Sequence, residues 1–432
     1  MINIYNYIKK INLATKYTIL ISVGIAALCI YTAPRAWVSL TKPSATAYVR
    51  ATGLPVEWEW VDLAQTTLFL EGDVRWRSRG GGYLTDQNSS RVVGPLLVSV
   101  ISKWLHDAWV ASVVMTWAAW CVCVWAVVAL VRWSSWPVTT EIGRRASTMT
   151  AIALTLTASG FLANVGDIDS HVVGYSGAAT GILLVLRSTG GPSIQRERPL
   201  VRPEVVGVSL FFLDGTLQLG MPLIALFCCI FVYHMLFGPC SGRLESVAKA
   251  FRMLSSFSVC WLLWWLLARI GSDGQFEFHN EAIARSREAL SDLIGLWNTF
   301  PGKVGGVLGI ALGLFQWWMI APAALGWIVA DRETRFWTFA WLGLIVVATV
   351  LTRYTASTVY LMFPSLYVLA SIGAGAIAEL IRRVVPWVHD GGYVNVLIAL
   401  AGAMMVSLMP VVSQLAFIWG DYTMPAVWWP GP

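Results

Sequence analysis

Apolar residues along this chain are gathered into long runs separated by short polar stretches. A membrane span needs about 20 predominantly apolar residues. Runs of this kind are found at 17–32, 107–131, 147–163, 173–187, 255–270, 304–328, 336–352, 358–380 and 394–418. A further run over 205–237 is too long for one span and is interrupted at residues 214–216, which predicts two short helices joined by an outward-facing turn. The pattern predicts an all-α, polytopic transmembrane helical bundle of about eleven spans.

Basic residues alternate with these runs and set the expected orientation. Residues 1–16 carry three lysines ahead of the first run, so we expect a cytoplasmic N-terminal segment. The transmembrane domain then covers 17–420 and leaves a C-terminal tail, 421–432, outside. Its first outer loop is residues 33–106, the largest polar stretch of the chain.

A second outer loop is expected over residues 271–303, and it contains an amphipathic pattern. Ile283, Leu290, Ile294 and Trp297 recur at helical spacing, opposite a charged face that includes Glu288. Such a helix is expected to lie in the plane of the membrane interface.

Composition agrees with a membrane protein and excludes most alternatives. Of the 432 residues, 57% are hydrophobic and 12% are charged, whereas soluble domains are about 25% charged. The net charge of +6 reflects basic flanks beside apolar segments and does not indicate a nucleic-acid partner. The seven cysteines lie in or beside apolar runs, which argues against a disulfide framework.

The first outer loop holds three candidate functional residues, and each also has a simpler interpretation. Asp62 begins a helical pattern within residues 57–72, so it is either an N-cap or a carboxylate for base catalysis or metal binding. Asp86 precedes a second surface helix and is the alternative base. Arg91 starts that helix, where the dipole disfavours a cation, so it faces an anion such as a phosphate, a lipid headgroup or a nearby carboxylate.

The remaining candidates lie in short segments between spans. Asp167 and Asp169, with His171 beside them, are either a site for a divalent cation such as Mg²⁺ or Mn²⁺ or a solvated acidic loop. Asp214 lies in the interruption at 214–216, and a carboxylate there faces a watery cavity or pairs with a cation. Arg353 and Tyr354 open a late span, and arginine is suited to bidentate contact with phosphate.

The order of these features resembles the GT-C superfamily of integral-membrane glycosyltransferases, in the branch of protein O-mannosyltransferases and lipid A aminoarabinose transferases. The matching segments in the first outer loop are Asp62, the Leu-Glu-Gly of residues 70–72, and Arg91 to Leu97. Further along, they are Asp169 to Arg187, the break at residues 213–216 with Asp214 where the family has lysine, and Arg353, Tyr354 and Pro364.

The resemblance implies transfer of a sugar from a polyprenyl-phosphate donor to a lipid, glycan or protein acceptor on the outer, periplasmic side. It implies Asp62, or Asp86, as the general base and the remaining candidates as ligands of substrate or metal. It also implies a bacterial inner (plasma) membrane as the location. Two other classes stay open from the sequence alone, namely a polysaccharide polymerase of the O-antigen type and a transporter of lipids or small molecules.

Overall fold

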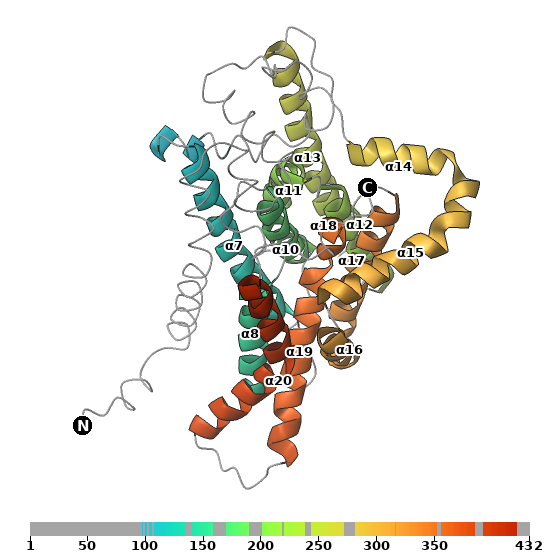
Figure 1. The fold of residues 1–432 in the computed structure, drawn as a ribbon. Coiled ribbons are helices and arrows are strands. Elements are labelled where there is room, and N and C mark those ends of the chain that lie inside the picture. Colours follow the sequence, from blue (N-terminus) through green and yellow to red (C-terminus); the bar gives the residue numbers. More distant parts are fainter. Residues whose placement is uncertain are drawn as a thin grey trace.

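The computed structural model describes residues 97, 100–101, 103–105, 108–134, 140–158, 170–189, 201–217, 220–237, 243–271, 281–315, 317–351, 356–384 and 392–420. Within these ranges the chain is helical, with no strand (Figure 1). The helices are α7 (Ala108–Trp133), α8 (Glu141–Leu156), α10 (Ser170–Thr189), α11 (Pro203–Leu217), α12 (Gly220–Phe237), α13 (Arg243–Gly271), α14 (Glu281–Ser291), α15 (Leu293–Phe315), α16 (Trp317–Val329), α17 (Arg332–Leu351), α18 (Ala356–Tyr360), α19 (Phe363–Val384) and α20 (Gly392–Gly420).

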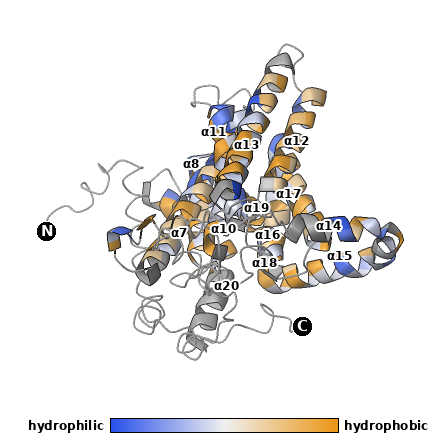
Figure 2. Ribbon diagram, turned by 90° about the horizontal axis from the view of Figure 1, so that it is seen from above, coloured by the Kyte–Doolittle hydropathy of each residue, from blue (hydrophilic) through white to orange (hydrophobic). Residues whose placement is uncertain are grey.

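Among the described residues, five helices are long and apolar enough to cross a membrane, or six if the bent pair α15 and α16 is one span. Figure 2 shows how far apolar residues dominate the bundle and where polar residues collect at helix ends. The all-helical, membrane-capable architecture is therefore confirmed. The count of about eleven spans stays a prediction, since the expected first span at 17–32 lies outside the described residues.

Several predicted runs coincide closely with helices, whereas others differ at one end. Helices α7, α10 and α17 match their apolar runs to within about four residues. Helix α13 begins at Arg243, twelve residues before the apolar run at 255, because the intervening residues include strong helix formers. Helix α8 spans 141–156 and not 147–163, so it begins in the basic segment that we assigned to a loop.

The run over 304–328 does not form one straight helix. Helix α15 begins at Leu293 and ends at Phe315, and α16 follows at an angle of 102°. Pro322 lies in the first half of α16, where it donates no backbone hydrogen bond. Hydrophobic periodicity did not reveal the bend, because apolar residues continue on both sides of it.

Two helices cross with almost no space between their backbones. The most extensive contacts of the described chain join α16 to α19. A Cβ added at Gly326 would collide with the carbonyl oxygen of Leu369, and one added at Gly373 would collide with that of Pro322. Small residues at a crossing allow this approach, which increases van der Waals contact between transmembrane helices.

The core beside this crossing is aromatic and fully enclosed. Tyr360 stacks on Phe363 with ring centroids 5.4 Å apart, and Tyr175 from α10 meets Tyr360 edge-on at 4.9 Å. The hydroxyls of Tyr360 and Tyr367 lie 3.1 Å apart and share a hydrogen bond. The indole of Trp341 donates a hydrogen bond to the carbonyl of Leu361 at 2.8 Å. These bonds satisfy polar groups that have no access to water.

The crossing of α16 and α19 should be sensitive to a single methyl group. Gly326→Ala is expected to destabilise the protein by about 1–3 kcal/mol, because the backbone of Leu369 must move to make room. Thermal unfolding in detergent, followed by tryptophan fluorescence, would measure the change. Gly343→Ala in α17 is the matched control, since nothing lies within 4 Å of its added Cβ. It should be neutral or stabilising by up to about 1 kcal/mol, and equal losses in both variants would contradict the crossing.

Candidate functional site

Most of the residues predicted to act in catalysis or binding lie outside the described part of the chain. These are Asp62, Asp86, Arg91, Asp167, Asp169, Arg353 and Tyr354. His171 belongs to the first turn of α10, but only its backbone is described. The roles of all these residues therefore stay predictions, and Asp214 is the one predicted site residue whose side chain can be placed.

Asp214 is buried inside the bundle, with 5% of its surface exposed. It lies in the last turn of α11 and not in a break, which begins only after Leu217. Gly181, near the middle of α10, faces Leu213 of α11 and Leu223 of α12, with each leucine side chain within about 3 Å of an added Cβ.

Leu213, and with it the neighbouring Asp214, consequently lies level with the middle of α10. We predicted two short helices here, which is right, but the position of the connecting turn was wrong. Apolar residues flank the carboxylate on both helices, so the hydrophobic pattern alone did not decide how deep in the bundle Asp214 lies. A carboxylate at such a depth is costly and is by default a candidate functional residue.

A cation that the sequence pattern did not single out lies at the end of α17. The ammonium group of Lys303, on α15, donates to the carbonyl oxygen of Val350 at 3.5 Å. A positive charge is favourable beside the last carbonyls of a helix. Because Val350 is three residues before Arg353, Lys303 lies close to the start of the segment predicted to bind phosphate. Its only signal in the sequence was a lysine beside an apolar run.

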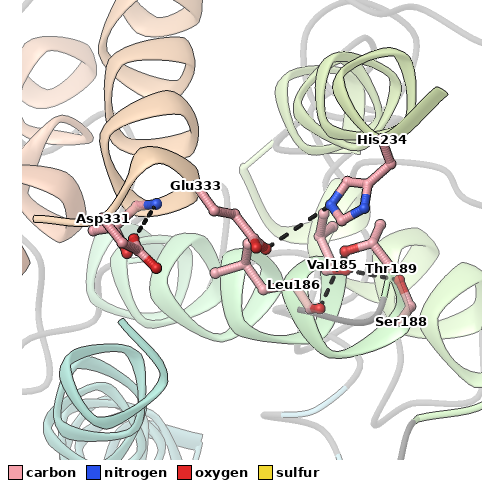
Figure 3. A network of polar contacts seen from close by, with 8 residues as sticks. Val185, Leu186, Ser188, Thr189, His234, Asp331 and Glu333 are labelled. Atoms are coloured by element: carbon pink, nitrogen blue, oxygen red, sulfur yellow. Dashed lines mark hydrogen bonds and ion pairs between the residues drawn. The ribbon is translucent and has the colours of Figure 1, made fainter. Parts of the chain in front are cut away.

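At another helix end, a histidine and a carboxylate join α12 to α17. Nε2 of His234 lies 3.9 Å from Oε1 of Glu333, and the two side chains are 23% and 12% exposed (Figure 3). Neither atom has a hydrogen bond within the described residues. Asp331 caps the same helix by accepting a bond from the backbone N–H of Thr334 at 2.8 Å.

Arginine and aromatic side chains surround this pair. The guanidinium of Arg332 lies 4.3 Å from the ring centroid of Phe237, and Tyr233 stacks on Phe336 at 4.4 Å. Figure 3 also shows the last turn of α10 nearby, where Ser188 and Thr189 bond to carbonyls of their own helix. Their hydroxyls therefore bond within α10, and His234 with Glu333 adds a polar contact to the aromatic contacts between α12 and α17.

A second buried carboxylate has a clear structural role. Oε1 of Glu379, in α19, accepts hydrogen bonds from both the backbone N–H and the hydroxyl of Thr140, each at 2.8 Å. Thr140 in turn caps α8 by accepting from the N–H of Gly143 at 3.2 Å. One oxygen thus joins α19 to the start of α8 across 239 residues of sequence.

The described residues contain no group of three or more metal-ligating side chains. The predicted pair Asp167 and Asp169 lies outside them, so the expected divalent cation remains a prediction. No protein family matches the chain, and comparison with curated proteins finds no significant relative. The assignment of the candidate site therefore rests on the residues of this chain alone.

Removal of the Glu379 carboxylate should weaken the junction of α8 and α19. Glu379→Ala leaves two donors of Thr140 without their acceptor, so we expect a loss of about 1–3 kcal/mol in thermal unfolding. Glu141→Ala is the control, because this exposed residue lies in the first turn of α8 and pairs with Arg145 one turn further along. It should cost less than about 0.5 kcal/mol. A smaller loss for Glu379→Ala than for Glu141→Ala would contradict the structural role.

Proposed function

We propose that the chain is an integral-membrane glycosyltransferase of the GT-C type. It moves a sugar from a polyprenyl-phosphate donor to a lipid, glycan or protein acceptor on the outer face of the membrane. The order of acidic and basic motifs along the sequence is the first support. The observation that carries the proposal furthest is Lys303 at the end of α17, since it adds a cation beside the segment that leads to Arg353 and Tyr354.

The proposed orientation is supported by which helix ends meet. If successive spans alternate in direction, certain helix ends must lie on the same side of the membrane. Three contacts join such ends, namely those of Thr140 with Glu379, Glu204 with Arg252, and His234 with Glu333. The same ends carry many of the basic residues in the described chain, including Arg332, Arg382 and Arg383. By the positive-inside rule this side is cytoplasmic, which gives an internal N-terminus and an external C-terminus. A bacterial plasma membrane is the expected location.

The chemistry follows from the charge that develops during transfer. Asp62 takes the proton of the acceptor hydroxyl as that oxygen bonds to the anomeric carbon, and Asp86 is the alternative base. The bond from this carbon to the phosphate oxygen breaks, and the phosphate leaves with the electron pair. General-base assistance contributes about 10²–10⁴-fold. Arg91, Arg353 and Lys303 stabilise the charge on the departing lipid phosphate.

A divalent cation, Mg²⁺ or Mn²⁺, would be held by Asp167 and Asp169, whose carboxylates are hard oxygen ligands. When bound, it would act as a Lewis acid on the phosphate. His171 follows these carboxylates and is proposed to contact the sugar. Asp167 and Asp169 directly precede α10, and His171 belongs to its first turn.

Asp214 favours a second candidate function, transport of a lipid or small molecule. Transporters place polar residues at the ends of short helices near the membrane midplane. The buried carboxylate at the α11–α12 tip, level with the middle of α10, has this character. In a glycosyltransferase the same group would bind sugar hydroxyls, and Asp214 is assigned that role in the leading proposal.

Sugar transfer in membranes tests the leading proposal. With a radiolabelled polyprenyl-phosphate sugar, Asp62→Asn should reduce transfer by about 10²-fold or more, because asparagine keeps the size and capping ability but removes the base. Asp292→Asn is the matched control, since Asp292 is an exposed helix cap on the proposed outer side and asparagine can also cap.

In the same assay, Lys303→Met should lower transfer while Lys303→Arg retains it, because the positive charge is the feature that matters. Equal transfer by wild type and Asp62→Asn would move the base to Asp86. Activity retained in Asp62→Asn, in the Asp86→Asn variant and in Lys303→Met would overturn the proposed mechanism.

The two functions predict different consequences of Asp214→Asn. If the protein is a transporter, Asp214→Asn should lose uptake or flipping of the substrate in sealed vesicles. In that case the wild-type protein should transfer no sugar. A glycosyltransferase should show transfer by wild type and a raised KM for the donor in Asp214→Asn, because a neutral amide still fills the space but binds hydroxyls less well. Purified protein in vesicles, assayed both for transfer of the sugar and for movement of the lipid, separates the two results.

A further inference from the structure

The elbow between α14 and α15 exposes large apolar side chains that no other described part of the chain covers. Leu290 is 50% exposed, Ile294 79% and Trp297 80%. Figures 1 and 2 both show the elbow extending away from the bundle, with α14 lying across the direction of α13. Side chains this exposed and this apolar are normally covered by a partner or by lipid.

An exposed carboxylate, that of Glu288, lies on the other side of α14 from this apolar surface. Glu288 precedes Leu290 by two positions, which places the two side chains on nearly opposite faces of α14. Asp292 forms the turn and caps α15 by accepting a hydrogen bond from the backbone N–H of Gly295 at 2.8 Å. The polar residue Asp292 therefore separates the end of α14 from the start of α15, and apolar side chains lie on both sides of it.

The apolar surface continues into a segment that is itself a candidate for the membrane. Leu308 and Leu312, further along α15, are both 53% exposed, and residues Trp297–Phe315 form the first half of the bent candidate span. Trp297 thus lies where an apolar segment begins, the position that tryptophan favours at membrane interfaces. This continuity identifies lipid, and not a second protein, as the occupant.

We propose that the α14–α15 elbow is an interfacial membrane anchor. Leu290, Ile294 and Trp297 enter the boundary between headgroups and acyl chains, and Glu288 faces water. Amphipathic helices bind in this way, with the apolar face buried about 5–10 Å. Since Lys303 ties α15 to the last turn of α17, the anchor also fixes the depth of that helix end in the membrane.

Cysteine labelling in sealed vesicles tests the anchor. Leu290→Cys and Glu288→Cys are compared for reaction with a membrane-impermeant maleimide, above the background from the native cysteines of the parent protein. Glu288→Cys should react at least about tenfold faster, because the position of Leu290 is shielded by lipid. The protein itself leaves both positions exposed, so both thiols should react at similar rates after unfolding in sodium dodecyl sulfate, which controls for their intrinsic reactivity.

Two outcomes would overturn the proposal. Equal rates in vesicles would show that the elbow projects into water. Protection of Leu290→Cys in detergent as well as in vesicles, together with disulfide-linked dimers, would show that a second copy covers it. Right-side-out and inverted vesicles are both labelled, so that the face on which Glu288→Cys reacts is identified. Reaction on the cytoplasmic face would contradict the proposed orientation of the chain but not the anchor.

Discussion

The crossing of α16 and α19 is the constraint on which the rest of the described bundle depends. Two glycines, Gly326 and Gly373, let the backbones touch, and α19 then packs on α8 and α20. Within a membrane, lipid competes for apolar side chains, so close packing contributes more than hydrophobicity to holding helices together. The enclosed aromatic cluster around Tyr360 fills the space beside the crossing and leaves no polar group of Tyr360, Tyr367 or Trp341 unsatisfied.

Two buried carboxylates and one partly buried carboxylate show how the fold accommodates polar groups in apolar surroundings. Glu379 is neutralised in effect by two donors of Thr140, which makes it part of the scaffold. Glu333 faces His234 at a helix end, where solvent and the basic residues of α17 are near. Asp214 lies at the tip of a short hairpin inside the bundle. Glu379 is thus part of the scaffold through its two hydrogen bonds, and Asp214 is a candidate functional residue because of its depth.

The far end of α17 connects the proposed site to the membrane surface. Lys303 reaches its last turn from α15, and α15 continues back to the elbow proposed as an anchor. A cation held there by a helix that rests in the interface would meet a lipid-linked phosphate at headgroup depth. The same geometry is compatible with the chemistry of a polyprenyl-phosphate donor, whose lipid tail stays in the bilayer while its phosphate reaches the aqueous side.

The sequence by itself determined that the chain is helical and membrane-embedded, because runs of apolar residues report burial in lipid directly. It also identified most described helices, with α7, α10 and α17 to within about four residues. Only the tertiary structure decided the 102° bend at the end of α15, the depth of Asp214, and the partners of Lys303 and Glu379. These features depend on contacts between distant segments, and an apolar pattern records that a residue is buried but not against what.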